Sequence, residues 1–196
     1  MIQYRLIQWS PALLRCYRTR MLLDWTRLCQ YLPVQGALLD VGCGVGSVDY
    51  EVASMNPGLR VLGIDIVPAS IDLARRYHAL PNIEFACRRL QDVGGRFDCI
   101  LFVDVFHHVP PKEWTSLLGI CSSLLCPGGY VLIKEIERRS GQISWLMDRY
   151  ISRCPEVYLR NCEEMVEVVS RDLRVVSSEV RFRLPFGHYY IRAASR

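Results

Sequence analysis

Three glycines alternate with other residues in the segment Asp40-Val-Gly42-Cys-Gly44-Val-Gly46. Glycines let a strand turn sharply into a helix, and they let a ligand approach the backbone with no Cβ in its way. Asp65 follows nineteen residues after Gly46, at the expected end of the second buried strand. In a doubly wound sheet, a carboxylate at that place lies beside the first crevice and accepts hydrogen bonds from both ribose hydroxyls. The pattern therefore predicts a site for a nucleoside.

The spacing of this loop argues against a dinucleotide. Dinucleotide-binding loops read G-x-G-x-x-G because a pyrophosphate lies at the helix N-terminus. Here the loop reads D-x-G-x-G-x-G, with Asp40 two residues before the first glycine. The carboxylate of Asp40 would repel a pyrophosphate, whereas it suits a ligand that bears an ammonium group. A glycine-rich turn without any ligand is the alternative, and the correctly spaced Asp65 disfavours it.

Short apolar runs alternate with helical segments through the middle of the chain, which predicts right-handed βαβ units and a mostly parallel sheet in an α/β fold. The expected strands are 37–42, 60–66, 82–87, 97–103 and 130–136, and the expected helices are 47–56, 68–78 and 111–125. The segment FDCILFV at 97–103 has the continuous hydrophobicity of a strand that is buried on both faces. Pro127-Gly128-Gly129 is expected to form a turn before the fifth strand.

Both ends of the chain differ from this pattern. Residues 11–32 carry apolar side chains at helical spacing, which predicts a long amphipathic N-terminal helix within a cap at 1–34. Near the other end, Asn161 and Glu164 have the spacing of a capping box that opens a helix to about residue 171. Alternating residues at 176–184 and 188–194 then predict a β-hairpin that closes one edge of the sheet.

The composition indicates one globular domain. The chain has 196 residues, of which 51% are hydrophobic, and no apolar run approaches the length that spans a bilayer. The N-terminus shows no signal peptide, and the nine cysteines include no C-x-x-C, so we expect reduced thiols, a cytoplasmic location and no metal. Residues 1–30 hold five arginines and one aspartate, which accounts for the net charge of +4. This excess is local, so we expect no nucleic-acid groove across the domain.

Residues 36–136 resemble the class I S-adenosylmethionine (SAM)-dependent methyltransferases. Four segments carry the resemblance, in the order found in that family: LLDVGCGVG, VLGIDIVPASIDLAR, FDCILFVDVFHHV and LLCPGGYVLIKE. The resemblance implies a seven-stranded Rossmann-like sheet over 35–196, with a lid inserted at about 138–160. It further implies SAM as the cofactor.

The resemblance also assigns residues to the cofactor. Its methionine end would be held by Asp40, Gly42, Gly44 and Gly46; its ribose by Asp65; its adenine by Ile66; and the pocket around its methyl group would be lined by Phe102, Val103 and Asp104. One departure concerns the adenine site. The family usually has Gly-Asp-Ala after the third strand, where this chain has Arg88-Arg89-Leu90. Either Asp92 or backbone groups near Arg89 and Leu90 would take the place of the usual acid.

His107 and His108 follow the fourth strand and are the predicted catalytic residues, because a histidine titrates near neutral pH and can act as a general base. A structural role in the loop is the alternative. His188 could reach the same cleft, although a surface position is expected for it. Glu135 and Glu137 are expected to be a solvated pair at the end of the fifth strand.

The acceptor is predicted to be a small molecule that is methylated on a hydroxyl or phenolic oxygen. No Asn/Asp-Pro-Pro-Tyr follows the fourth strand and no Pro-Cys dipeptide occurs, which disfavours methylation of DNA bases. The alternatives are an N-methyltransferase and a catalytically silent SAM-binding or partner-binding module. Arg15, Arg18 and Arg20 permit docking of the N-terminal helix on an acyl carrier protein or peripherally on a membrane, against the alternative of a solvated helix face.

Overall fold

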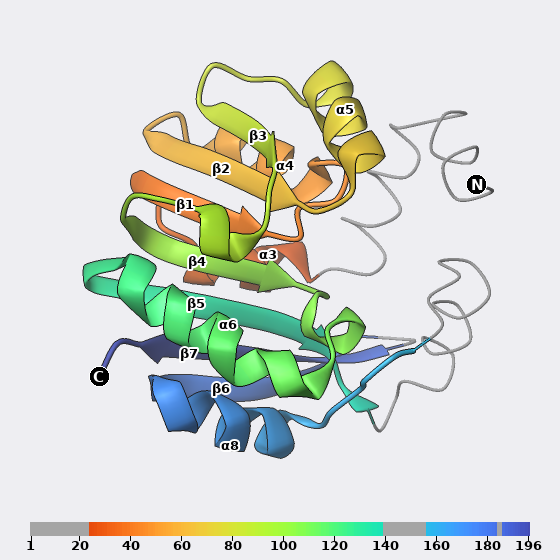
Figure 1. The fold of residues 1–196 in the computed structure, drawn as a ribbon, viewed down its shortest axis with the longest axis vertical. Helices are drawn as coiled ribbons and strands as arrows, with labels where there is room; N and C mark the ends of the chain where they lie inside the picture. The colour runs from red at the N-terminus through yellow and green to blue at the C-terminus, as the bar shows by residue number, and fades with distance from the viewer. Residues whose placement is uncertain (1–23, 139–155, 184–185) are drawn as a thin grey trace.

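A seven-stranded mixed sheet forms the centre of the molecule (Figure 1). The computed structural model describes residues 24–138, 156–183 and 186–196. The strand order is β3-β2-β1-β4-β5-β7-β6, in which β1 to β5 are parallel and β7 runs antiparallel to both β5 and β6. The predicted fold class, a doubly wound and mostly parallel sheet with an antiparallel C-terminal hairpin, is confirmed.

The strands lie close to the positions predicted for them. They are β1 (Gly36–Val41), β2 (Leu59–Asp65), β3 (Ile83–Cys87), β4 (Phe97–Val103), β5 (Leu125–Ile136), β6 (Arg174–Arg183) and β7 (Phe186–Ala194). The largest difference is the start of β5, which includes the predicted turn at Pro127-Gly128-Gly129. Gly128 has a φ of +81°, and the pairing with β4 shifts register between Phe97 and Cys99. Residues 127–129 therefore form an irregular part of the extended strand β5 and not a separate turn before it.

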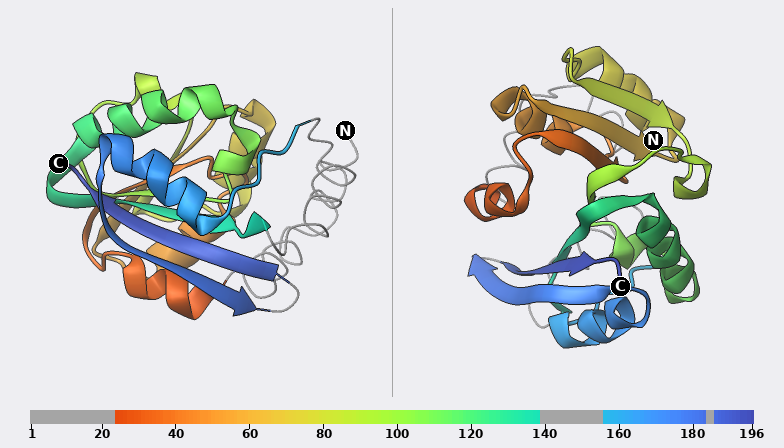
Figure 2. Two further views of the ribbon diagram at one scale, coloured as in Figure 1. Left: turned by 90° about the horizontal axis from the view of Figure 1, so that it is seen from below. Right: turned by 90° about the vertical axis from the view of Figure 1, so that its left-hand side faces the viewer.

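Helices cover both faces of the sheet (Figure 2). On one face, α3 (Trp25–Tyr31) and α4 (Ser47–Met55) pack in one core cluster with β1, β2 and β4. On the other face, α6 (Pro111–Leu124) and α8 (Cys162–Asp172) pack in a second cluster. The helix α5 (Pro68–Tyr77) packs against β3 and the glycine loop, and two short 3₁₀ turns are η2 (Leu90–Asp92) and η3 (Phe106–His108). Within the described residues, no helix is long and apolar enough to cross a bilayer.

The central strand β4 explains why the sheet needs both layers. Successive side chains of a strand point to opposite faces. Accordingly, Leu101 and Val103 belong to the cluster beneath α3 and α4, whereas Ile100 and Phe102 belong to the cluster beneath α6 and α8. Burial of each such side chain contributes roughly 1.5–3 kcal/mol. A strand that is apolar at every position is stable only between two layers, as the sequence predicted.

The helix α8 begins with the predicted capping box. The side chain of Asn161 accepts a hydrogen bond from the backbone N–H of Glu164 at 2.8 Å, and the carboxylate of Glu164 accepts one from the backbone N–H of Asn161 at 3.2 Å. Two of the free N–H groups at the helix start are thereby satisfied. This cap sets the point at which the chain enters the layer over β6.

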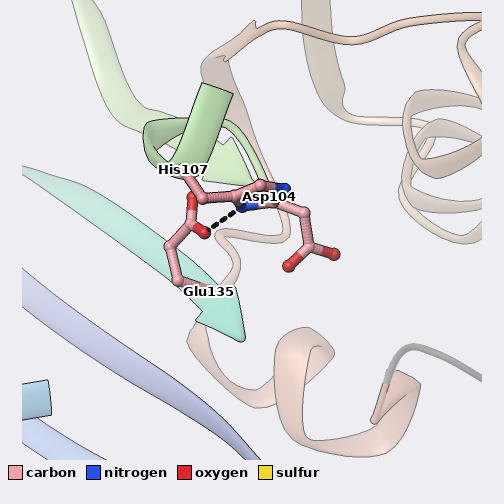
Figure 3. Close-up of side chains that lie close together, drawn as sticks. All are labelled: Asp104, His107 and Glu135. Carbon is pink, nitrogen blue, oxygen red and sulfur yellow. Dashed lines mark hydrogen bonds and ion pairs between the residues drawn. The ribbon is translucent and has the colours of Figure 1, made fainter. Parts of the chain in front are cut away.

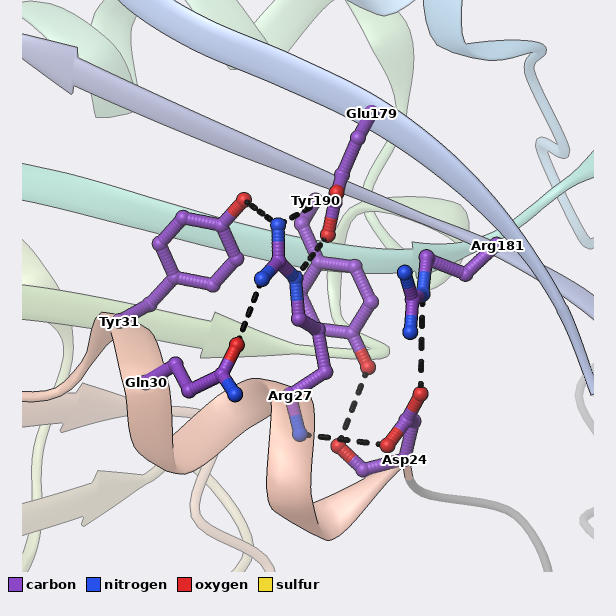
Figure 4. A network of polar contacts seen from close by, with 7 residues as sticks. All are labelled: Asp24, Arg27, Gln30, Tyr31, Glu179, Arg181 and Tyr190. Carbon is purple, nitrogen blue, oxygen red and sulfur yellow. Dashed lines mark hydrogen bonds and ion pairs between the residues drawn. The ribbon is translucent and has the colours of Figure 1, made fainter.

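The helix α3 is fastened to the C-terminal hairpin (Figure 4). Asp24 caps it by accepting from the backbone N–H of Arg27 at 3.2 Å. The guanidinium of Arg27 donates to Oε2 of Glu179 at 2.6 Å and to the hydroxyl of Tyr31 at 3.1 Å, and the ring of Tyr31 stacks on Tyr190 with centroids 5.8 Å apart. The end of the predicted N-terminal helix is therefore present. The rest of that helix, most of the predicted lid, and Arg15, Arg18 and Arg20 lie outside the described residues.

Candidate cofactor and active site

The loop after β1 has a backbone that favours glycine at three positions. Gly42, Gly44 and Gly46 have φ values of +78°, +57° and +77°. The loop is also tightly packed, since a Cβ on Gly42 would lie 2.7 Å from Cγ2 of Val105 and a Cβ on Gly46 would lie 2.5 Å from the ring of Phe85. Larger side chains would thus meet both backbone strain and steric clash.

The loop bounds a small hollow at the carboxyl ends of β1 and β4. Its lining residues are Asp40, Gly42, Cys43, Ser47, Val48 and Val103. Asp40 and Ser47 are both buried, at 3% and 4% exposure. Three of these six residues were singled out from the sequence. The other three lie in the loop or in the first turn of α4, and the position of that turn directly after the glycines is the signal that could have identified them.

Asp65 connects two loops at this edge of the sheet. Its Oδ2 accepts a hydrogen bond from the backbone N–H of Gly44 at 2.9 Å, and its Oδ1 accepts one from the N–H of Val67 at 2.8 Å. A carboxylate offers about four lone-pair sites, so both oxygens can accept further hydrogen bonds. Next to Asp65, Ile66 is 71% exposed, which is unusual for a large aliphatic side chain at a strand end. The two residues present a polar and an apolar surface side by side.

The remaining predicted cofactor residues lie elsewhere. Phe102 is fully buried in the opposite layer, with its ring 4.8 Å from that of Phe106, and it does not line the hollow. After β3, Arg89 is exposed, whereas Leu90 is 4% exposed and belongs to the core. Asp92 is exposed on η2. The cofactor roles of these residues stay predictions.

A buried pair joins the turn after β4 to the end of β5 (Figure 3). The Nδ1 of His107 is 2.6 Å from Oε2 of Glu135, and the two side chains are 3% and 2% exposed. The other oxygen of Glu135 accepts hydrogen bonds from the backbone N–H groups of Val105 and Phe106, at 2.7 and 2.6 Å. Glu135 therefore holds both the imidazole and the backbone of the turn that carries it. His108 is exposed, with its ring centroid 4.0 Å from that of His107.

Asp104 forms a second ion pair beside the first. The ammonium group of Lys134, a fully buried residue, donates to the two carboxylate oxygens of Asp104 at 2.8 and 2.7 Å. Burial acts to raise the pKa of Asp104, but the charges of Lys134, His107 and His188 outweigh it and lower that pKa. Asp104 also has a φ of +56°, which costs a residue with a Cβ roughly 1–2 kcal/mol. Backbone strain and a buried charge pair at one position are typical of functional sites.

The expectation that Glu135, Glu137 and His188 are at the surface was wrong. They are 2%, 3% and 2% exposed. Glu137 accepts a hydrogen bond from the backbone N–H of Cys162 at 3.1 Å, which joins the end of β5 to the start of α8. His188 is opposite Ile136 in the antiparallel pairing of β5 and β7. Because β5 and β7 are far apart in the sequence, neither segment alone predicts that they pair and bury these side chains.

Asp104, His107 and Glu135 each offer a ligand atom, and these atoms lie within 4.8 Å of one another. Carboxylate oxygens and an imidazole nitrogen are ordinary metal ligands. However, Lys134 already compensates the charge of Asp104, and three hydrogen bonds already occupy the oxygens of Glu135. A metal ion at this place would have to displace several of these contacts.

Comparison with known proteins points to one family. A family model described as "Methyltransferase domain" matches residues 39–131. The protein named "Ubiquinone biosynthesis O-methyltransferase" from Chromobacterium violaceum is 33% identical over 110 residues, which cover 53% of this chain and 45% of that protein. The chain thus spans about half the length of the curated relatives it matches.

Solved structures share the fold. A protein from Pyrococcus horikoshii aligns with a TM-score of 0.75 at 19% identity, over 92% of this chain and 91% of that one. Human N-acetylserotonin methyltransferase, solved in complex with SAM, aligns with a TM-score of 0.74 at 17% identity, over 99% of this chain and 56% of that one. At these identities the likeness concerns the arrangement of helices and strands.

Proposed function

We propose that this chain, which a methyltransferase-domain model matches over residues 39–131, is a class I SAM-dependent enzyme that methylates an oxygen atom of a small molecule. The observation that carries the proposal is the loop at Gly42–Gly46, which Asp65 joins to the end of β2 beside a hollow that contains Asp40. The names of the relatives support oxygen as the methylated atom.

The residues at this edge of the sheet fit the proposed cofactor. The three positive-φ glycines place no side chain between the loop backbone and a ligand, and the buried carboxylate of Asp40 is a partner for an ammonium group. Asp65 would hold the ribose through its remaining lone pairs, and Ile66 has the exposed apolar surface that an adenine ring would cover. The cofactor would supply an electrophilic methyl group on a sulfonium.

His107 is the proposed general base. A hydroxyl nucleophile must lose its proton as the new carbon–oxygen bond forms, and a positioned imidazole can accept that proton. Since Nδ1 of His107 is engaged by Glu135, Nε2 is the nitrogen assigned to the acceptor hydroxyl. Glu135 fixes the orientation of the ring and stabilises the imidazolium that forms. Asp104 and Lys134 keep the adjacent turn in its strained conformation.

The finer predictions stay open to experiment. An N-methyltransferase would use the same cofactor site with an amine acceptor, and a silent SAM-binding module would bind the cofactor without turnover. The relatives' names give no support to an acyl carrier protein as a partner, and a basic docking helix would involve residues outside the described ones. The cytoplasmic location, the N-terminal cap and the lid are likewise predictions.

Two measurements test the proposed function. Calorimetric titration with SAM, S-adenosylhomocysteine (SAH) and NAD should show binding of the first two alone. Incubation with methyl-labelled SAM and a panel of phenols, catechols, carboxylic acids and amines should then give a labelled O-methyl product, identified by mass spectrometry. Methylation of amines alone would favour the N-methyltransferase. Binding of SAM with no product from any acceptor would favour the silent module, and binding of NAD in place of SAM would overturn the proposal.

A further inference from the structure

A second buried carboxyl lies beside Asp40. Asp49 is the third residue of α4 and is 1% exposed. Its carboxyl interacts with its own backbone N–H and with the carboxyl of Asp40. Asp40 is paired with Gly63 in the register of β1 and β2. The opposing strand β2 approaches closely here, since a Cβ on Gly63 would lie 3.0 Å from Oδ1 of Asp49. The side chain is thus confined between α4 and the sheet.

Two adjacent carboxyl groups in such a place cannot both be ionised at low cost. Taking a charge out of water is unfavourable, and a second negative charge nearby adds repulsion. Burial, and then the charge of Asp40, raise the pKa of Asp49 well above its ordinary value. A shared proton between two carboxyls is the usual solution of this conflict. The raised pKa means that the pair keeps one proton at a pH where an exposed aspartate has already lost it.

The other titratable groups nearby are few in the described part of the chain. Cys43, in the glycine loop, is buried, and the pKa of its thiol is raised by burial and by Asp49, Asp40 and Asp65. From the end of α5, His78 places Nδ1 2.7 Å from the carbonyl oxygen of Val45. From β2 and β3, the neighbours of Asp49 are Gly63 and Phe85.

We propose that Asp49 is a positioning residue for the cofactor, and that the Asp40–Asp49 pair releases its shared proton to solvent when an ammonium group enters the hollow at the glycine loop. The inference rests on the proposed function, because it takes the amino-acid end of the cofactor as the source of the ammonium group. The proton leaves the pair, whose charge goes from −1 to −2, and the incoming positive charge compensates the additional negative one. Asp49 acts through Asp40, which lines the hollow.

This coupling predicts a particular dependence of affinity on pH. Where the pair holds its proton, binding must expel it, so the affinity for SAH rises with pH by up to tenfold per unit. Above the range in which the pair loses its proton without ligand, the affinity becomes independent of pH. A lone ionised Asp40 would give no such slope between pH 5.5 and 8, because an ordinary aspartate is already ionised there.

The test is calorimetric titration of the full chain between pH 5.5 and 8, in buffers with different heats of ionisation, which gives the number of protons released per ligand bound. The probes are SAH, which carries the ammonium group, and 5′-methylthioadenosine, which lacks the amino-acid end. We expect up to one proton released with SAH and none with methylthioadenosine. Asp49→Asn should bind SAH without proton release, with affinity that no longer varies with pH.

A matched control is Asp72→Asn, which removes an exposed carboxylate from α5 and should behave as the parent chain. If Asp49→Asn fails to fold, the comparison of the two probes on the parent chain decides the matter alone. Equal proton release with both probes, or SAH binding without release, would overturn this inference and leave the methyltransferase proposal intact. Failure of the parent chain to bind SAH at all would overturn both. Proton release that persists in Asp49→Asn would assign it to Cys43 or His78 instead.

Discussion

The imidazole of His107 and the carboxylate of Glu135 are in contact at 2.6 Å in the interior of the protein. They come from segments 28 residues apart, the turn after β4 and the end of β5. A carboxylate that also accepts two backbone N–H groups of the same turn cannot move away from the ring without losing those bonds as well. The orientation of His107 is thus built into the loop rather than left to side-chain flexibility.

The two adjacent histidines should differ sharply on substitution. Loss of a general base lowers turnover by roughly 10²–10⁴-fold, and we expect this for His107→Ala in the methyl-transfer assay. His108→Ala is the matched control, because His108 is exposed and should retain most of the turnover. SAH affinity should be similar in both variants. Equal turnover of the two variants, or a greater loss in His108→Ala, would remove His107 from the proposed role.

Asp65 should matter for cofactor affinity. An amide offers one accepting oxygen where the carboxylate offers two, so Asp65→Asn cannot accept from both Gly44 and Val67 and loses the negative charge facing the ribose. Hydrogen bonds to charged groups contribute about 1.5–3 kcal/mol, which corresponds to roughly 10- to 150-fold weaker SAH binding. Glu84→Gln, on the exposed side of β3, should leave the affinity unchanged. Calorimetric titration with SAH makes the comparison, and unaltered affinity in Asp65→Asn would contradict the assigned contact.

Two glycines with nearly the same φ separate backbone strain from steric clash. Gly128→Ala, at φ +81° with open space around it, should cost about 1–2 kcal/mol of unfolding free energy. Gly42→Ala, at φ +78° and facing Val105, should cost a further 1–3 kcal/mol or so, because overpacking is added to the same strain. Denaturant unfolding of the two variants measures the difference. Similar losses in both would mean that the loop yields easily at Gly42.

The pair of Asp104 and Lys134 should be coupled in stability. Lys134→Met leaves a carboxylate without its cation and should cost about 3–5 kcal/mol in unfolding free energy. Asp104→Asn leaves a buried ammonium and should be similarly destabilising; asparagine is chosen because it tolerates the left-handed conformation. The double variant should recover part of the loss, and strict additivity of the two single changes would exclude a direct interaction.

Acid should weaken this pair in a defined direction. Because the folded pKa of Asp104 is below its ordinary value, its contribution to stability is complete above the ordinary pKa and is lost as the pH falls through the folded one. Unfolding experiments from pH 7 down to pH 3 should therefore show a steeper loss for the parent chain than for Asp104→Asn. Parallel curves would show that Asp104 does not contribute to the acid sensitivity.

Much of the fold could be predicted because local patterns and global packing agree. The run FDCILFV coincides with β4, and the capping box at Asn161 opens α8 as expected. The glycine loop and Asp65 were placed correctly because their spacing follows from the geometry of one βαβ unit. These features depend on residues near one another in the chain.

The rest depends on contacts between distant segments. Lys134 stands in an apolar strand, but only the pairing of β4 with β5 shows that its partner is Asp104. The burial of His188 and Glu137 follows from β7 and α8, which join the sheet from the far end of the sequence. In the sequence, Asp49 is one polar residue of a predicted helix, and only the packing of that helix on β2 shows that its side chain is buried. A single sequence contains no direct record of these pairings.

Because of the order of the elements along the chain, the two halves of the proposed site become complete at different stages of synthesis. The loop at Gly42–Gly46 and its tie to Asp65 lie within one βαβ unit, which leaves the ribosome as a block. The turn that carries His107 is bordered by β5, and β5 has its antiparallel neighbour only after β7 has emerged. A nascent chain therefore possesses the glycine loop and Asp65 well before the catalytic half can close, so the emergence of β7 is the step that allows the second half of the proposed site to form.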